Sequence, residues 1–314
     1  MFGFSRSKII SYLILIIAIL SAIYLVRGQR DTLSKIFEIN IFQFSIISLI
    51  VLLTPLADGL RTMLLTKQFG VNLTVKESFA LSSVNNFWNY LPFTGGIIVR
   101  SVYLKKKHGF SYTNFISTVA ASYIISFLSF GLVGLVSVLI IWQTKGFANL
   151  WVVSIFLLSV LFSLTMIKIN LKFNIKFLSL LSKVFSGWKI LRERKSLLIN
   201  LMLLDFVLIL VFAIRLSLAA QFLGTPLPFL GILVIVSLSL FAVLLNVTPG
   251  ALVVKEAIIS FGAAALSYNP YEGFTISLLD RAVSMVWIFL LGVIFSYYLT
   301  SSRQVNKGKS KSVV

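Results

Sequence analysis

Residues 112–142 read YTNFISTVAASYIISFLSFGLVGLVSVLIIW, and this run contains no charged side chain. A helix of about 20 apolar residues spans the hydrocarbon core of a bilayer, which is about 30 Å thick. The backbone N–H and C=O groups of such a segment find no water in lipid, so they must pair with each other within a helix. The run therefore predicts a transmembrane helix.

The rest of the chain has the same apolar character. Of its 314 residues 58% are hydrophobic, against about 45–50% in soluble domains. Continuous runs, rather than the alternating strands of about 10 residues that build a membrane barrel, favour helices. Further runs lie at 9–26, 39–56, 150–167, 197–222, 229–245 and 274–299. Together with 112–142 and a crossing at 249–268, they predict an all-α polytopic transmembrane bundle of about eight spans.

The charge pattern predicts the orientation of these spans. The net charge is +19, and basic residues gather between the apolar runs, at Lys105–Lys107, at 168–196 and after residue 300. Cytoplasmic loops of membrane proteins are rich in Lys and Arg. We therefore expect an inner (cytoplasmic) membrane protein with both termini in the cytoplasm. No aromatic-interleaved basic motif indicates a nucleic-acid partner.

Three regions follow from this pattern: a transmembrane domain at 1–299, the basic segment 168–196 within it, and a basic tail at 300–314 that is predicted to be disordered. Apolar residues recur at spacings of three and four through 173–191, which indicates an amphipathic helix. We expect this helix to lie in the cytoplasmic headgroup region; the alternative is a connector that packs on the bundle. It is also a candidate docking surface for a protein partner.

Residues that carry most enzyme chemistry are scarce. The chain has no cysteine, nine acidic residues and one histidine, His108, which follows three lysines. This composition disfavours thiol chemistry, metal sites and a catalytic triad. We predict that the protein is not an enzyme and uses no cofactor or metal.

Two apolar segments are interrupted in similar ways. Residues 78–104, SFALSSVNNFWNYLPFTGGIIVRSVYL, contain Asn89, Pro92, Gly95 and Gly96, besides Asn85 and Asn86. A second segment contains Asn246, Pro249 and Gly250, at an offset of 157 residues, half the chain. Broken helices at membrane depth are tolerated where they are buried in protein or line a wet cavity. Paired Gly/Pro-interrupted segments in two halves indicate a transporter's binding site and a two-half pseudo-repeat, although chance accounts for so short a pattern equally well. We expect 78–104 to form a re-entrant or broken helical pair.

Charged side chains inside apolar segments are costly and usually face a partner or a cavity. They include Arg100, Asp205, Arg215, Lys255, Glu256, Asp280 and Arg281. We predict that Glu256 pairs with Arg281 and that Asp280 pairs with Lys255. These pairs either hold helices together, or Arg100, Lys255 and Arg281 bind a phosphate-type headgroup in a cleft between the halves.

These segments resemble a known family. The stretch NYLPFTGGIIVRSVYL, 89–104, is similar to the first signature of the lysylphosphatidylglycerol synthase transmembrane-region family of flippase-like proteins: a Pro, then Gly-Glu, then Arg. The stretch TPGALVVKEAIISFG, 248–262, resembles the second signature, and Arg281 stands where the family has an arginine in its last span. The resemblance covers about 5–299. It departs at Ile97, where the family has an acidic residue.

The resemblance implies a lipid-translocating protein. The residues that match its motifs are Pro92, Gly96, Arg100, Pro249, Gly250, Lys255, Glu256 and Arg281. Full-length synthases also carry a soluble aminoacyl-transfer domain, for which the 15 residues after 299 leave no room. The resemblance therefore implies the membrane part alone.

The predicted function is binding and translocation of a phospholipid or lipid-linked glycan, with anionic or glycan-linked membrane lipids as partners. The predicted headgroup-binding residues are Asn89, Pro92, Gly95, Gly96, Arg100, Asn246, Pro249, Gly250, Lys255, Glu256, Asp280 and Arg281. The alternative is a non-transporting subunit that anchors or regulates a lipid- or glycan-modifying enzyme. An intramembrane enzyme and a small-solute transporter remain weaker alternatives.

Overall fold

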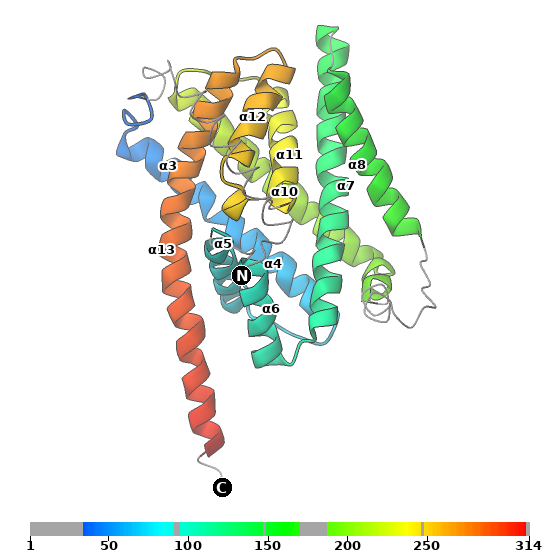
Figure 1. The fold of residues 1–314 in the computed structure, drawn as a ribbon, viewed down its shortest axis with the longest axis vertical. Helices are drawn as coiled ribbons and strands as arrows, with labels where there is room; N and C mark the ends of the chain where they lie inside the picture. The colour runs from blue at the N-terminus through cyan, green and yellow to red at the C-terminus, as the bar shows by residue number, and fades with distance from the viewer. Residues whose placement is uncertain (1–33, 91–94, 147–148, 170–186, 246–247, 312–314) are drawn as a thin grey trace, which may run out of the picture. The chain divides into compact units, whose positions relative to one another are not determined.

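A computed structural model describes residues 34–90, 95–146, 149–169, 187–245 and 248–311. The predicted first span at 9–26, the predicted site residues Pro92 and Asn246, and most of the basic segment 168–196 lie outside these ranges. Within them the regular structure is entirely helical (Figure 1), which confirms the predicted all-α polytopic fold.

Five helices in the described ranges are long and apolar enough to cross a membrane. They are the α3–α4 segment (α3 Ile41–Val51, α4 Leu53–Lys67), α7 (Tyr112–Lys145), α8 (Leu150–Lys168), α10 (Lys195–Phe222) and the part of α13 (Pro270–Lys311) as far as Ser301. The apolar helix α11 (Phe229–Leu245) is shorter. The chain is therefore a multi-pass membrane protein.

The predicted span 39–56 is longer in the structure than in the sequence interpretation. Helix α4 continues through Pro55 and Asp58 to Lys67. Proline is tolerated in the first turn of a helix, where its missing N–H has no intrahelical partner to lose. Pro55 lies in that first turn, so it interrupts the helix near Leu52 without ending it, and Asp58 and Arg61 lie inside the candidate span instead of near its end.

Two other expectations also change. The predicted crossing at 249–268 is broken into a 3-10 turn, η2 (Pro249–Ala251), and the 12-residue helix α12 (Val254–Ala265). Twelve residues rise only about 18 Å, too little to cross about 30 Å of hydrocarbon. Helix α13 extends to Lys311, so the segment from 300 to 311 is helical where a disordered tail was predicted.

The chain divides into two compact units. One comprises Met1–Val51, Ser126–Met166 and Asp205–Val283, and the other comprises Leu52–Ile125, Ile167–Leu204 and Ser284–Val314. We call them unit 1 and unit 2. The helices α7, α10 and α13 each contribute residues to both units.

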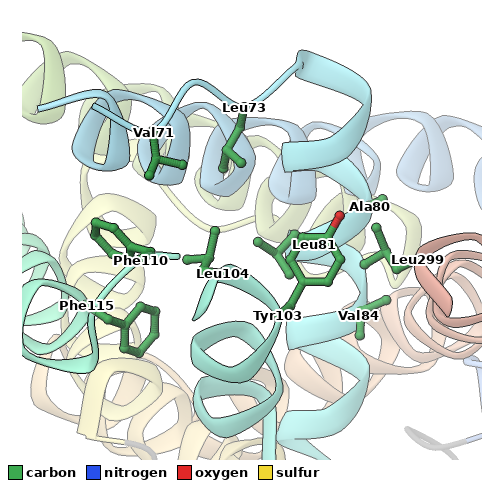
Figure 2. Close-up of a cluster of buried hydrophobic side chains, with 10 residues drawn as sticks. All are labelled: Val71, Leu73, Ala80, Leu81, Val84, Tyr103, Leu104, Phe110, Phe115 and Leu299. Atoms are coloured by element: carbon green, nitrogen blue, oxygen red, sulfur yellow. The ribbon is translucent and has the colours of Figure 1, made fainter. Parts of the chain in front are cut away.

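In unit 2 the core lies around two short helices, α5 (Val75–Asn89) and α6 (Gly95–His108). Figure 2 shows Leu104 of α6 between Leu81 of α5 and the loop residues Val71 and Leu73. The hydroxyl group of Tyr103 is the polar atom within this cluster. Burial of these apolar side chains holds α5 and α6 against their neighbours.

A second cluster in unit 2 contains residues from the end of the basic segment. Residues 187–192 are helical, and Trp188 and Leu191 are 5% and 0% exposed among Leu65, Ile125 and other apolar residues. This part of the apolar face therefore packs against other apolar residues of unit 2. The remainder of the predicted amphipathic helix lies outside the described residues.

In unit 1, small residues allow helices to approach closely. A Cβ at Gly134 of α7 would lie 2.2 Å from the ring of Phe156 of α8, and a Cβ at Gly262 of α12 would lie 3.2 Å from Ile235 of α11. Within each of these two pairs, α7 with α8 and α11 with α12, the helices lie side by side in Figure 1. Asp205, one of the charges within a span, accepts a hydrogen bond from Ser126 at 3.1 Å, so its role is to join α10 to α7.

Candidate functional site

The first interrupted segment forms a pair of short antiparallel helices. The start of α6 lies against the end of α5, because a Cβ at Gly96 would lie 2.4 Å from Asn89 Oδ1 and 2.2 Å from the Asn85 carbonyl oxygen. A Cβ at Gly95 would similarly lie 2.8 Å from the Trp88 carbonyl oxygen. Only glycine fits at such a contact. The predicted broken helical pair is thus confirmed outside residues 91–94, and each helix is too short to cross the membrane alone.

Arg100 of α6 lies against α4 in unit 2. Its Nη1 donates a hydrogen bond to Thr62 Oγ1 at 3.3 Å, and its guanidinium carbon lies 5.6 Å from the ring centre of Phe115. The carboxylate of Asp58, one turn before Thr62, interacts electrostatically with Arg61 and Arg100. The interrupted segment therefore places Arg100 beside the polar face of α4 that carries Asp58 and Thr62.

The α5 asparagines complete this arrangement. Asn86 hydrogen-bonds to the Asp58 carboxylate, and the Asn85 amide nitrogen donates to Asn86 Oδ1 at 3.3 Å. We call Asp58, Arg61, Thr62, Asn86 and Arg100 the α4–α6 polar cluster. Apart from buried Thr62, its members are partly exposed. A partly exposed polar group on helices of a membrane protein can receive a polar ligand.

Most members of this cluster were not predicted from the sequence as site residues. Of its members only Arg100 was among the predicted site residues. Asp58 and Arg61 come after the predicted span 39–56, so the length of the apolar run placed them outside it. The available signal was their spacing: Asp58, Arg61 and Thr62 are three and four residues apart and so share one helix face.

Glu77 forms a separate polar network at the beginning of α5. Its Oε1 accepts hydrogen bonds from the Tyr103 hydroxyl at 2.7 Å and from Lys107 Nζ at 2.9 Å, and His108 Nε2 lies 2.8 Å away. Thr74 caps the helix by accepting from the Glu77 N–H at 3.2 Å. Three side chains of the last turns of α6 are therefore anchored to the first turn of α5.

These contacts change the acid–base properties of the network. Burial alone raises the pKa of Glu77, but the hydrogen bonds from Tyr103, His108 and Lys107 outweigh it and lower the pKa to about 2. Burial and the contact with Glu77 raise the pKa of Tyr103 to about 12. An ionised carboxylate only accepts hydrogen bonds, so His108 Nε2 must donate. His108 therefore has a structural position as a hydrogen-bond donor to Glu77. No group of side chains that could hold a metal ion occurs among the described residues.

The second interrupted segment lies in unit 1 and is held by ion pairs. Arg281 of α13 donates to the Glu256 carboxylate, and also to the carbonyl oxygens of Gly250 and Ala251 at 3.1 Å each. Asp280 Oδ2 lies 2.9 Å from Lys255 Nζ. Both predicted ion pairs are therefore present.

Arg215 of α10 adds a third cation that the pairing hypothesis did not include. Its Nε and Nη2 lie 2.8 and 2.6 Å from Asp280 Oδ1. We call Arg215, Lys255, Glu256, Asp280 and Arg281 the α12–α13 charge cluster. All five residues are buried, with exposed fractions between 0 and 8%. Because α10 also contributes, this cluster joins three elements of unit 1.

The backbone before α12 has an unusual conformation. Gly250, Ala251 and Val253 have φ angles of 60°, 51° and 66°. For a β-branched residue such as Val253 a positive φ is rare and costs free energy. The hydrogen bonds from Arg281 to this turn help to hold it, so much of the donor capacity of Arg281 serves the fold.

These features define a polytopic helical membrane protein whose described residues include the α4–α6 polar cluster and the Glu77 network in unit 2 and the α12–α13 charge cluster in unit 1. A model of the lysylphosphatidylglycerol synthase TM region matches residues 9–292, and the chain belongs to this family. It is therefore a membrane protein tied to lipid metabolism or transport. The TM region of the family is not its catalytic domain. No match was found among curated proteins or among solved structures.

Proposed function

We propose that this protein binds a phospholipid or lipid-linked glycan and translocates it across the cytoplasmic membrane. The observation that carries the proposal is the position of Arg100, a partly exposed arginine on a short broken-helix hairpin in a lipid-related membrane protein. An arginine at such a place matches the geometry of a phosphate group. The basic loops support the proposed inner-membrane orientation with cytoplasmic termini.

The predicted site residues contribute in different ways to this proposal. Arg100 binds the phosphate, while Asn89, Gly95 and Gly96 shape the surface beside it. Lys255, Glu256, Asp280 and Arg281 keep α12 and its Pro249–Gly250 turn in place. This division follows from their hydrogen bonds, because the second group is buried and mutually paired.

Lipid movement in proteoliposomes tests the proposal. The probe is phosphatidylglycerol with a fluorescent label on one acyl chain, and dithionite added outside destroys the label in the outer leaflet. We expect wild-type protein to expose inner-leaflet probe and Arg100→Gln to slow this by about tenfold or more, the value of a lost charge-assisted hydrogen bond. Lys106→Gln, an equal charge change on the exposed side of α6, is the matched control.

Two outcomes oppose the proposal. If Arg100→Gln moves lipid as fast as wild type, Arg100 is not the phosphate site. If wild-type protein moves no probe yet retains anionic lipid, the alternative of a non-transporting subunit is favoured.

A further inference from the structure

Lys255 is a buried lysine that shares its carboxylate partner with an arginine. Its Nζ lies 2.9 Å from Asp280 Oδ2, while Arg215 Nε donates to Asp280 Oδ1 at 2.8 Å. Both cations also lie beside the ring of Phe212. Lys255 Nζ is 5.2 Å from the ring centre, and the guanidinium carbon of Arg215 is 4.8 Å from it. One carboxylate therefore serves two cations that lie close to each other.

Two arginines add positive charge around Lys255. Arg215 and Arg281 both act on it electrostatically, with Asp280 as the opposing negative group. Glu256, the next residue in the chain, is bonded to Arg281. Helix α11, which packs against α12, carries no charged residue. In the α12–α13 charge cluster three cations therefore face two carboxylates.

The position of Lys255 in its helix opposes its charge as well. Helix α12 begins at Val254, so Lys255 lies in the first turn, where the helix dipole places positive partial charge. Burial also disfavours an ammonium group, because the protein interior solvates charge less well than water. One carboxylate thus holds this cation against burial, two arginines and a helix N-terminus. The charged and neutral forms of Lys255 are therefore closer in free energy than those of a lysine in water.

Lys255 is the member of this cluster that can lose its positive charge. An arginine keeps its proton in proteins, because the guanidinium pKa lies above about 12. Protonation of Asp280 or Glu256 would increase the excess of positive charge. Loss of one proton from Lys255 instead leaves two arginines facing two carboxylates. The Lys255 side chain is 10% exposed, against 2% for Arg215 and 0% for Asp280, so it is also the less enclosed group.

We propose that Lys255 is a proton-binding site that couples lipid movement to a pH gradient. Its ammonium group gives one proton to water on one side of the membrane, and the neutral amine keeps N–H groups that can donate to Asp280. It takes a proton back from water on the other side. Loss of the charge weakens the bond from α12 to α13, which allows the short helix α12 to move. The coupling rests on the proposed function, whereas the proton site does not.

Thermal unfolding of the full-length protein in detergent tests the proton site without transport. Lys255→Met keeps an apolar stem and leaves the two arginines facing the two carboxylates, so we expect it to fold. A base whose pKa is lower in the folded than in the unfolded protein makes stability rise with pH, because the unfolded state binds more protons. The wild-type midpoint should therefore rise relative to that of Lys255→Met as the pH approaches the ordinary lysine value of 10.5, by about 2–4 °C per pH unit. Lys145→Met, which changes an exposed lysine of unit 1, should follow wild type.

Proteoliposomes with a pH gradient test the coupling. The external pH is fixed, the internal pH is set about one unit lower, equal or about one unit higher, and valinomycin with equal potassium on both sides holds the membrane potential at zero. The first phase of bleaching by external dithionite reports the share of acyl-labelled phosphatidylglycerol in the outer leaflet. For wild type and Lys145→Met we expect this share to shift in opposite directions with the two gradients. The limit is about tenfold per pH unit for one proton per lipid. For Lys255→Met we expect no dependence on internal pH.

Each failure has its own signature. A midpoint difference between wild type and Lys255→Met that does not change with pH would overturn the proton site. Probe that moves in wild type but ignores the gradient, or a full response to the gradient in Lys255→Met, would overturn the coupling. If the wild-type protein moves no probe at all, the proposed function fails instead, and the midpoints still decide the proton site.

Discussion

The α12–α13 charge cluster and the α4–α6 polar cluster are built on similar sequence motifs, but the basic residues of the two clusters differ in their burial and in their hydrogen-bond partners. In each, a Pro/Gly interruption precedes a short helix, and a basic residue follows a glycine by five positions: Arg100 after Gly95, and Lys255 after Gly250. Lys255 is buried and bonded to Asp280. Arg100 is partly exposed, and its Nε has no hydrogen-bond partner in the described structure. Under the proposed function, the second motif serves stability and the first motif serves ligand binding.

The largest effect expected from this comparison is on the α12–α13 charge cluster. Asp280→Ala would leave Arg215 and Lys255 as buried cations without their carboxylate, which costs about 3–5 kcal/mol. We expect loss of the folded monodisperse species, or a large fall in its thermal midpoint, in detergent size-exclusion chromatography. Glu272→Ala, in the first turn of the same helix, serves as control, and equal stability of the two variants would contradict a structural role for the cluster.

A smaller effect is expected at the network that joins α5 to α6. Glu77→Gln weakens the charge-assisted hydrogen bonds from Tyr103 and Lys107, and we expect a loss of about 1–3 kcal/mol. Because the folded pKa of Glu77 is about 2 and its ordinary value is 4.5, this stabilisation is full above pH 4.5. It is lost as the pH falls through 2.

Thermal unfolding of wild type and Glu77→Gln at several pH values checks this sign. The gap between the two proteins should be constant near neutral pH and narrow below pH 4.5. A gap that widens in acid would show that Glu77 is not ionised in the folded protein.

The helix cap before this network should contribute less. Thr74→Ala removes the side-chain acceptor for the Glu77 N–H and is expected to cost about 1 kcal/mol. Thr74→Ser keeps the acceptor and should restore most of the stability in the same unfolding measurement.

The smallest effect on stability is expected at Arg100, which sharpens the comparison with Asp280. Arg100→Gln removes one hydrogen bond, to Thr62 at 3.3 Å, from a partly exposed side chain, so we expect about 1 kcal/mol or less. The thermal midpoint should stay close to wild type while lipid transport falls. Collapse of the fold on this change would place Arg100 with the structural charges of α12–α13.

Much of the fold was predictable because apolar run length alone sets which segments can span a membrane. The runs at 112–142, 150–167 and 197–222 correspond closely to α7, α8 and α10. The ion pairs Glu256–Arg281 and Lys255–Asp280 were predictable too, since charges in apolar segments must find partners. The end of α4 was not predictable from the sequence. A proline is tolerated in the first turn of a helix but breaks or kinks a helix interior, and only the backbone structure shows which position Pro55 occupies.

The sequence by itself determined the membrane class, the helical secondary structure and the two interrupted segments, because these depend on local composition and on the cost of unpaired backbone groups in lipid. Tertiary structure alone decided which further charges meet beyond the two predicted ion pairs. Arg215 joins Asp280 across 65 residues, and Asp58 and Arg61 of α4 meet Arg100 of α6. Such contacts depend on how separate helices pack, and no local pattern specifies that packing.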